Sequence, residues 1–130
     1  MSQIGERYRL MQTIAENTVL NSGEWLTRAE LNNISLELDE WERSGKIFSV
    51  HHDNTDYYPI YTLDSGNRPL DAIKEIISIF SGHKDEWGMA FWFMSANGYL
   101  GGATPKSIIT TEPDRVLAAA RDEIEGVTHG

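Results

Sequence analysis

The hydrophobic periodicity of the chain changes twice, and this constrains the fold more than any other feature. Over residues 4–20 apolar side chains recur at helical spacing. Over residues 47–61 β-branched and aromatic residues flank a polar turn at residues 53–56, a pattern typical of a β-hairpin. From residue 70 onward the helical spacing returns. We therefore expect a mainly α protein of the α+β class with one short hairpin.

Local signals divide the segment before the hairpin into two short helices. Thr27 is followed three residues later by a glutamate, the capping-box pattern that begins a helix. Asn32 and Asn33 predict a turn. Ser35 then predicts the cap of a second helix, with Leu36 on its apolar side. Two short helices followed by a hairpin are the layout of a winged helix-turn-helix.

The second half predicts a small helical bundle. Residues 64–69 have the composition of a linker, and helices are expected over 70–80, 85–94 and 105–109. The last helix is expected from residue 111 to Gly126. These boundaries predict two modules, residues 1–64 and residues 65–130.

Charge and composition exclude several classes of protein. The formal net charge is −9, with 5 basic and 11 acidic side chains in residues 1–66 and 6 and 9 in residues 67–130. Nonspecific binding to nucleic acid depends on neutralising phosphates, so this balance weighs against it. The absence of cysteine excludes disulfides and thiol chemistry. No apolar run reaches the roughly 18 residues of a membrane helix, and no secretory signal is evident, so we expect a cytoplasmic protein.

A metal site is not expected. His51 and His52 are adjacent on a predicted strand, so their side chains point to opposite faces and do not readily bind one ion together. No cysteine and no second local cluster of ligands supports them.

The first module resembles the winged helix of MerR-like proteins over residues 23–63. The resemblance is carried by the segments WLTRAEL, WERSGKIFSV and DYYPIY. It implies that the second short helix enters the major groove of DNA. That helix, however, is rich in carboxylates, which repel phosphates. Two hypotheses therefore stay open. The module either binds operator DNA or is a degenerate winged helix used for packing or dimerisation. The candidate DNA-binding residues are Thr27, Arg28, Asn32, Asn33, Arg43, Lys46 and His51.

Residues 87–94, WGMAFWFM, are apolar on nearly every side of the expected helix. A module of this size has a limited interior, so we expect at least one aromatic ring to stay partly exposed. The alternatives are a helix mostly in the core and a helix divided between the core and an interface.

The segment NGYLGG, residues 97–102, predicts a turn in which Tyr99 and Leu100 form an apolar plug. Gly101 and Gly102 allow either a close approach or a positive φ. No strand precedes the glycines and no Lys-Ser/Thr pair follows, so a phosphate-binding loop is not expected.

Residues 83–126 resemble the toxin-binding domain of Xre/MbcA/ParS-type antitoxins. The pattern is a helix, Leu-Gly-Gly, a proline that begins a short helix with an aliphatic pair, and a last helix with Val-Leu. The resemblance implies a non-catalytic protein that binds a cognate toxin, often dimerises and often represses its own operon. The implied partner-binding residues are Trp92, Tyr99, Leu100, Gly101, Gly102, Pro105, Arg115 and Arg121. The family usually carries an all-helical DNA-binding part, whereas this chain carries a winged one.

No pattern of residues favours catalysis. There is no cysteine nucleophile and no Gly-x-Ser-x-Gly elbow, and no cofactor motif is present. The leading hypothesis is an antitoxin-like regulator with a toxin-binding second module and operator DNA as a further partner. The alternative is a protein-interaction module whose winged helix does not bind DNA. A DNA mimic is a third hypothesis, although the acidic residues lack regular spacing.

Overall fold

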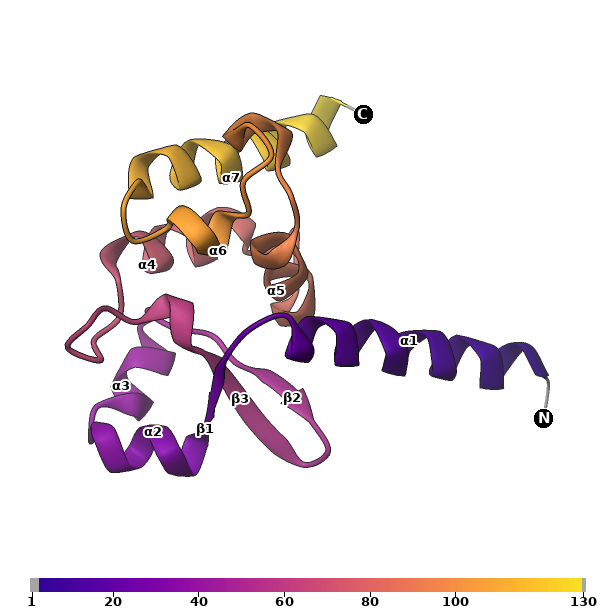
Figure 1. Ribbon diagram of the computed structural model, residues 1–130, viewed down its shortest axis with the longest axis horizontal. Helices are drawn as coiled ribbons and strands as arrows, with labels where there is room; N and C mark the ends of the chain where they lie inside the picture. The colour runs from indigo at the N-terminus through magenta and orange to yellow at the C-terminus, as the bar shows by residue number, and fades with distance from the viewer. Residues whose placement is uncertain (1–2, 130) are drawn as a thin grey trace.

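A computed structural model describes residues 3–129, with side chains described for residues 5–126. It contains seven α-helices, two short 3-10 helices and three strands within that range (Figure 1). Their bounds are α1 Gln3–Asn21, β1 Trp25–Thr27, α2 Arg28–Ile34, α3 Leu38–Arg43, β2 Val50–His52, β3 Thr55–Pro59, η1 Ile60–Thr62, α4 Asp71–Phe80, α5 Glu86–Met94, η2 Gly98–Leu100, α6 Pro105–Ile108 and α7 Pro113–His129. The predicted mainly helical α+β fold with one hairpin is confirmed.

The three strands form one antiparallel sheet in the order β1-β3-β2. Leu26 pairs with Tyr58 across β1 and β3, and His51 pairs with Asp56 in the hairpin. Strand β1 was not expected, because three residues carry too little alternation to be recognised. Pro59 ends β3. That position suits proline because the residue needs no further ladder bond from its nitrogen.

The capping box that begins α2 is confirmed. The Glu30 N–H donates to Thr27 Oγ1 at 3.2 Å, and the Thr27 N–H donates to Glu30 Oε1 at 2.9 Å. The predicted turn at Asn32 and Asn33 is wrong, because both residues lie inside α2.

The predicted start of the second short helix is also wrong. Ser35 ends α2 as its C-cap, and α3 begins after Glu37. Leu36 lies between the helices and is almost fully exposed. The Ser35 hydroxyl accepts a hydrogen bond from the Glu37 N–H at 3.1 Å, so it stabilises the turn between the helices rather than the helix itself.

The core joins both halves of the chain. The larger of its two clusters brings Val19, Phe48 and Val50 against residues of α4, α5 and α7, including Ile76 and Phe93. The smaller cluster lies between α2, α3 and the sheet and consists of Leu31, Leu38, Trp41, Ile47, Tyr58 and Leu63. The segment expected as a linker is an ordered turn, because the Asp64 carboxylate accepts hydrogen bonds from the Gly66 and Arg68 N–H groups. The two halves therefore share a core across an ordered connection.

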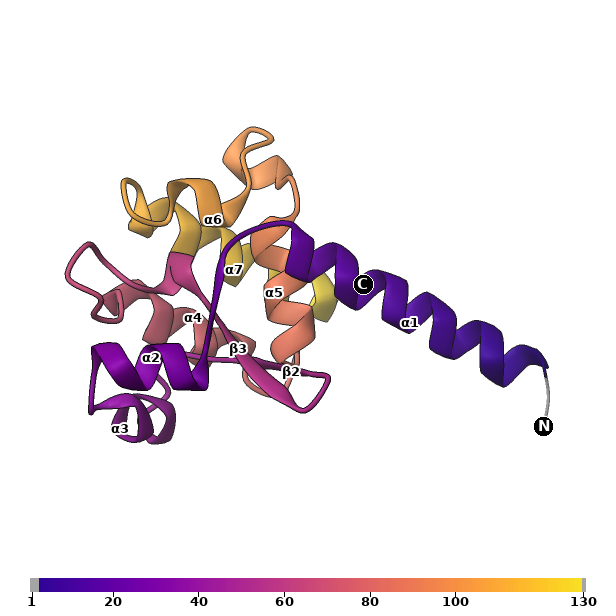
Figure 2. The same ribbon diagram turned by 60° about the horizontal axis from the view of Figure 1, so that its bottom comes forward.

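Helices α4 to α7 pack together above the sheet in the view of Figure 1. The last of them continues to His129, so Gly126 does not end it as expected. Helix α1 is different, because both views show it projecting away from the rest of the molecule (Figures 1 and 2). Within residues 3–129, no helix combines the length and apolar character that crossing a membrane requires.

Candidate interaction surface

Helix α5 presents one ring to solvent and keeps its other apolar side chains buried or partly buried. The Asp85 carboxylate caps its start by accepting from the Gly88 N–H at 2.7 Å. Met89, Trp92 and Phe93 are buried in the larger core cluster. Phe91 projects from the opposite side and is 56% exposed. The expectation that one aromatic ring stays exposed is met by Phe91, which the family resemblance did not single out.

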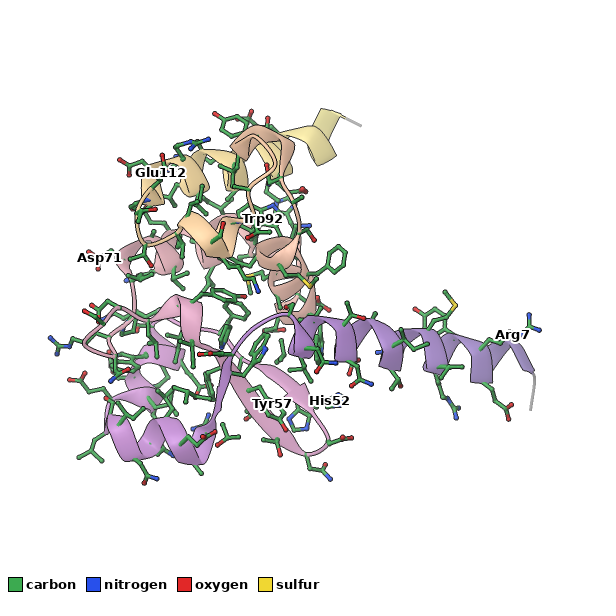
Figure 3. All side chains as sticks on the ribbon, in the orientation of Figure 1. Arg7, His52, Tyr57, Asp71, Trp92 and Glu112 are labelled. Carbon is green, nitrogen blue, oxygen red and sulfur yellow. The ribbon has the colours of Figure 1, made fainter. Side chains whose placement is uncertain are left out.

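Trp92 lies in the core rather than on the surface (Figure 3). Its ring packs edge-on against Phe80 at 4.9 Å and against Phe93 at 5.1 Å between centroids. The indole Nε1 is buried and has no hydrogen-bond partner. Trp92 is 5% exposed and lines one side of a small cleft, so a partner protein reaches only the edge of this ring unless the helices move apart.

The turn after α5 is held by Asn97. Its side-chain oxygen accepts from the Tyr99 N–H at 2.9 Å, and its backbone oxygen accepts from the Leu100 and Gly102 N–H groups at 3.0 and 2.9 Å. Leu100 is buried, as the predicted plug requires, whereas Tyr99 is 54% exposed. The turn thus inserts one apolar side chain into the core and directs the ring beside it outward.

Gly101 and Gly102 are explained by backbone conformation. Their φ angles are 67° and 93°, values that residues with a side chain rarely adopt. A Cβ added to either glycine meets no atom within 4 Å. Of the two reasons considered for the glycine pair, positive φ applies and close approach does not.

A cleft of about 250 Å³ lies beside this turn. Its lining includes Phe91, Ser95, Asn97 and the ion pair between Lys84 Nζ and Glu123 Oε2, which are 3.8 Å apart. Tyr99 follows Asn97 by two residues. We define the α5–η2 surface as Lys84, Phe91, Asn97, Tyr99 and Glu123. Phe91 and the charge pair line the cleft, whereas Tyr99 does not line it and is exposed on the neighbouring turn.

The other partner-binding candidates do not converge on this surface. Pro105 is buried at the first position of α6. Arg115 is half exposed and donates from Nη1 to both carboxylate oxygens of Glu112 at 3.1 Å. Arg121 lies six residues further along α7, which places it on a different side of the helix. The structure therefore brings Tyr99, Leu100, Gly101 and Gly102 together in one turn and leaves the two arginines apart.

No family model matches the chain, and no curated protein or solved structure matches it.

Arg28, one of the cations of the DNA-binding hypothesis, is already paired with carboxylates of the protein itself. Its guanidinium contacts the carboxylates of Asp39, Glu42 and Asp56, with Nη1 to Asp39 Oδ1 at 3.3 Å and Nε to Asp56 Oδ2 at 3.8 Å. The same group lies 5.9 Å from the centre of the Tyr58 ring. Arg28 therefore joins α2, α3 and β3, and a phosphate would have to compete with three carboxylates for it.

Tyr58 completes this network from the sheet. Its hydroxyl donates to Glu42 Oε1 at 3.0 Å. Burial, followed by the hydrogen bond and the negative charge of Glu42, raises the pKa of Tyr58 to about 12. The group is therefore a neutral structural donor at physiological pH.

The remaining DNA-binding candidates are also mostly engaged with the protein itself. The Thr27 hydroxyl caps α2, Arg43 Nη2 lies 3.2 Å from Glu40 Oε2, and His51 Nδ1 lies 2.7 Å from Asp56 Oδ1. Asn32 and Asn33 are exposed on α2, and Lys46 is half buried. The cations of this set lie among carboxylates.

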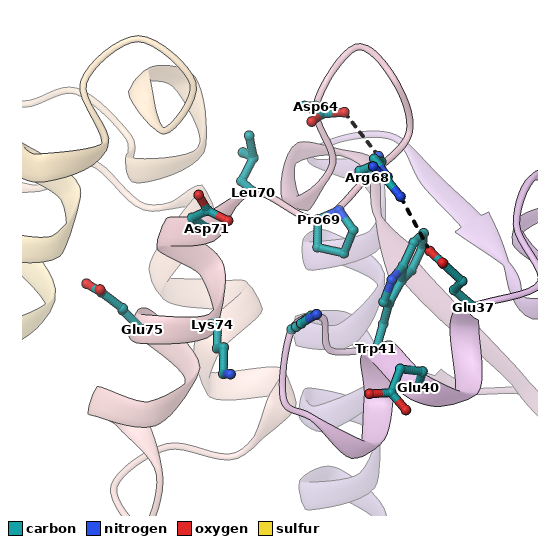
Figure 4. A pocket seen from close by; sticks show the side chains of 11 residues that line it. Glu37, Glu40, Trp41, Asp64, Arg68, Pro69, Leu70, Asp71, Lys74 and Glu75 are labelled. Carbon is teal, nitrogen blue, oxygen red and sulfur yellow. Dashed lines mark hydrogen bonds and ion pairs between the residues drawn. The ribbon is translucent and has the colours of Figure 1, made fainter.

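A cleft of about 670 Å³ lies between α3 and α4 (Figure 4). Its charged lining residues are Glu37, Glu40, Lys46, Asp64, Arg68, Asp71, Lys74 and Glu75. Arg68 Nη2 lies 3.9 Å from Glu37 Oε2, and the Arg68 N–H donates to Asp64 Oδ1 at 3.0 Å. With five carboxylates and three cations, this cleft selects for no single sign of charge.

The two adjacent histidines separate as expected. His51 is exposed and bonds Asp56, whereas His52 is mostly buried and its Nδ1 lies 3.0 Å from Glu16 Oε1. Among the residues that the structure describes, no group of three or more histidine, aspartate or glutamate side chains is placed to hold a metal ion.

Proposed function

We propose that this protein is a non-catalytic, antitoxin-like binding protein that holds a cognate toxin against the α5–η2 surface. The observation that carries the proposal is the pair of exposed rings, Phe91 at 56% on α5 and Tyr99 at 54% within the fixed turn that follows this helix. Aromatic side chains are enriched in the energetic centres of protein interfaces, because they bury much apolar area with few rotatable bonds. A rigid turn further lowers the entropy lost on binding.

The family resemblance gains a physical reason under this proposal. In the Leu-Gly-Gly pattern, Leu100 anchors the turn in the core, while Gly101 and Gly102 provide the left-handed backbone that the turn requires. Pro105 then restarts a helix at its first position. The pattern serves to fix a loop whose outward residue, Tyr99, is free for a partner. This supports a binding role in which the turn has a fixed conformation and the exposed rings make the contact with the partner protein.

We further propose that the N-terminal half is a degenerate winged helix that serves packing and dimerisation instead of reading DNA. The order α1, β1, α2, α3, β2, β3 and the strand order β1-β3-β2 support this assignment. The helix that would enter the major groove, α3, carries Asp39, Glu40 and Glu42, and Arg28 is already held by carboxylates. A surface of this charge repels a phosphate backbone. Operator DNA is therefore the weaker of the two partner hypotheses.

The test is co-expression of the chain with the product of each reading frame that flanks its gene. We expect one flanking product to copurify with the wild type in a stable complex, and its toxicity to be relieved. Phe91→Asp and Tyr99→Asp each place a charge on the α5–η2 surface and abolish that complex. Leu36→Asp is the matched control, because it changes an exposed apolar residue of another turn, and it leaves the complex intact.

Two results would refute the proposal. One is that neither flanking product binds or is neutralised. The other is that Leu36→Asp weakens the complex as much as Tyr99→Asp does. The DNA hypothesis has its own measurement: a gel shift with the DNA upstream of the gene at low salt, with and without the partner, is expected to show no complex.

A further inference from the structure

The N-terminal half of α1 exposes a row of large apolar side chains. Tyr8, Leu10, Met11 and Ile14 are 72%, 60%, 68% and 56% exposed. Every residue from 6 to 15 is exposed. Figures 1 and 2 show this part of the helix extending beyond the rest of the molecule. An exposed apolar patch on a projecting element is typical of a binding surface.

The base of α1, in contrast, is fixed to the protein. Val19 is buried in the larger core cluster, and the Leu20 carbonyl accepts from Trp25 Nε1 at 3.0 Å. Glu16 is hydrogen-bonded to His52, whose ring also packs edge-on against Trp87 at 6.3 Å. These contacts fix the direction of the helix. The projecting half is therefore a continuation of an anchored helix.

The chain does not cover this row by itself. Leu20, which packs on the core, lies nine residues from Met11, or about two and a half turns. Glu16, which bonds His52, lies two residues from Ile14. Both spacings place Met11 and Ile14 on the side of the helix opposite to the side that contacts the protein. Tyr8 lies eleven residues, or about three turns, from the buried Val19, so it is in line with Val19 but on the projecting, exposed half of the helix. Folding α1 back would require a break in the helix.

We infer that this row pairs with the same row of a second copy, with the two α1 helices antiparallel. Four side chains of this size expose on the order of 500 Å². Pairing two such rows buries on the order of 1,000 Å² in total, which reaches the lower limit for a specific interface. The surface is thus just large enough for a dimer.

Charge supports both the second copy and its direction. The one charged residue described between Met11 and Ile14 around the helix is Arg7, and an antiparallel pair keeps the two Arg7 side chains apart. Each chain carries a formal charge of −9, and most of it lies outside α1. An antiparallel pair places the two acidic bodies at opposite ends of a helix about 28 Å long, whereas a parallel pair would place them side by side.

The test is the mass of the intact chain in solution by light scattering or sedimentation. We expect twice the chain mass of 14.7 kDa for the wild type. Ile14→Asp halves the mass, because the charge would be buried between the helices. Thr13→Asp makes the same change one residue away, on an exposed side outside the row, and keeps the dimer. Circular dichroism of both variants confirms that the fold is retained, and Met11→Asp repeats the test at a second position.

Three outcomes would overturn the inference. The first is a monomeric wild type, including one that instead binds lipid vesicles or only a different protein through this row. The second is an equal effect of Ile14→Asp and Thr13→Asp. The third concerns direction: Arg7→Cys is expected not to form a disulfide with itself, since the two residues lie about 12 Å apart along an antiparallel pair centred on residue 11, the midpoint of the row. Efficient cross-linking of this variant would contradict the antiparallel arrangement.

Discussion

Helices α1 and α5 both carry many apolar side chains, yet the fold buries them to very different extents. Helix α5 contacts α1, α6 and β2 and buries Met89, Trp92 and Phe93. Helix α1 has such neighbours only near its C-terminal end, and its apolar side chains from Tyr8 to Ile14 stay exposed. The difference teaches that apolar content alone does not separate core from interface. What decides is how many elements the fold places around each helix.

The largest effect that distinguishes the two helices is expected at Trp92. Trp92→Ala removes a ring packed against Phe80 and Phe93 and leaves a cavity, so it lowers the free energy of unfolding by about 3–5 kcal/mol. Phe91→Ala, one residue away but exposed, is the control and changes it by less than about 1 kcal/mol. Urea denaturation of both variants measures this. Equal effects would place Trp92 at the surface and remove the distinction between the two sides of α5.

The next effect concerns the turn that supports Tyr99. Gly101→Ala forces a side chain into a left-handed conformation and costs about 1–2 kcal/mol. Gly126→Ala is the matched control, because this glycine lies within α7, where alanine favours the helix. Thermal unfolding should show a lower transition temperature for the first variant and an equal or higher one for the second. A neutral Gly101→Ala would mean that the turn adopts another conformation.

A smaller effect, of opposite sign, is expected at Tyr61, whose ring packs 4.8 Å from that of Phe93 on α5. Its hydroxyl is buried without a partner. Tyr61→Phe removes the unsatisfied group and raises the free energy of unfolding by about 1 kcal/mol at neutral pH. A loss of stability would instead reveal a hydrogen bond to this hydroxyl.

The same residue gives a pH dependence of known sign. Burial raises the pKa of Tyr61 above its ordinary value of about 10. The unfolded chain therefore loses this proton first, so stability is fully present below about pH 10 and is lost as the pH rises above it. Tyr61→Phe is expected to make the alkaline decline shallower.

The smallest effect is expected on α1. Met11→Gln, made in the Ile14→Asp background so that pairing does not contribute, changes the free energy of unfolding by less than about 0.5 kcal/mol, because Met11 contributes little to the core. Urea denaturation at a single protein concentration suffices. A change as large as that of Trp92→Ala would show that this half of α1 packs against its own chain.

The sequence predicted local features well and surface exposure poorly. The Thr27 capping box, the hairpin and the long helices follow from residues within a few positions of each other. Strand β1 escaped prediction because its three residues pair with residues 30 to 34 positions away. The same limit applies to Arg28, since its carboxylate partners come from α3 and β3.

The candidate site was predicted in part. The turn from Tyr99 to Gly102 is where the family pattern placed it, and Leu100 is the plug that was expected. Phe91 and the exposed row of α1 depend on which neighbours cover each helix, and periodicity does not contain that information. Even so, the helical period places Phe91 opposite Met89 and Phe93, which is a signal that could have separated it from Trp92.

The central claim is that the protein has two separate binding surfaces, one on α1 for its own copy and one at α5–η2 for a partner protein. Native mass spectrometry of the chain co-expressed with its flanking gene products tests it directly. The account predicts that the double variant Phe91→Asp, Tyr99→Asp keeps the dimer and loses the partner, while Ile14→Asp keeps the partner and loses the dimer. Loss of both interactions in either variant, or of neither, would contradict it.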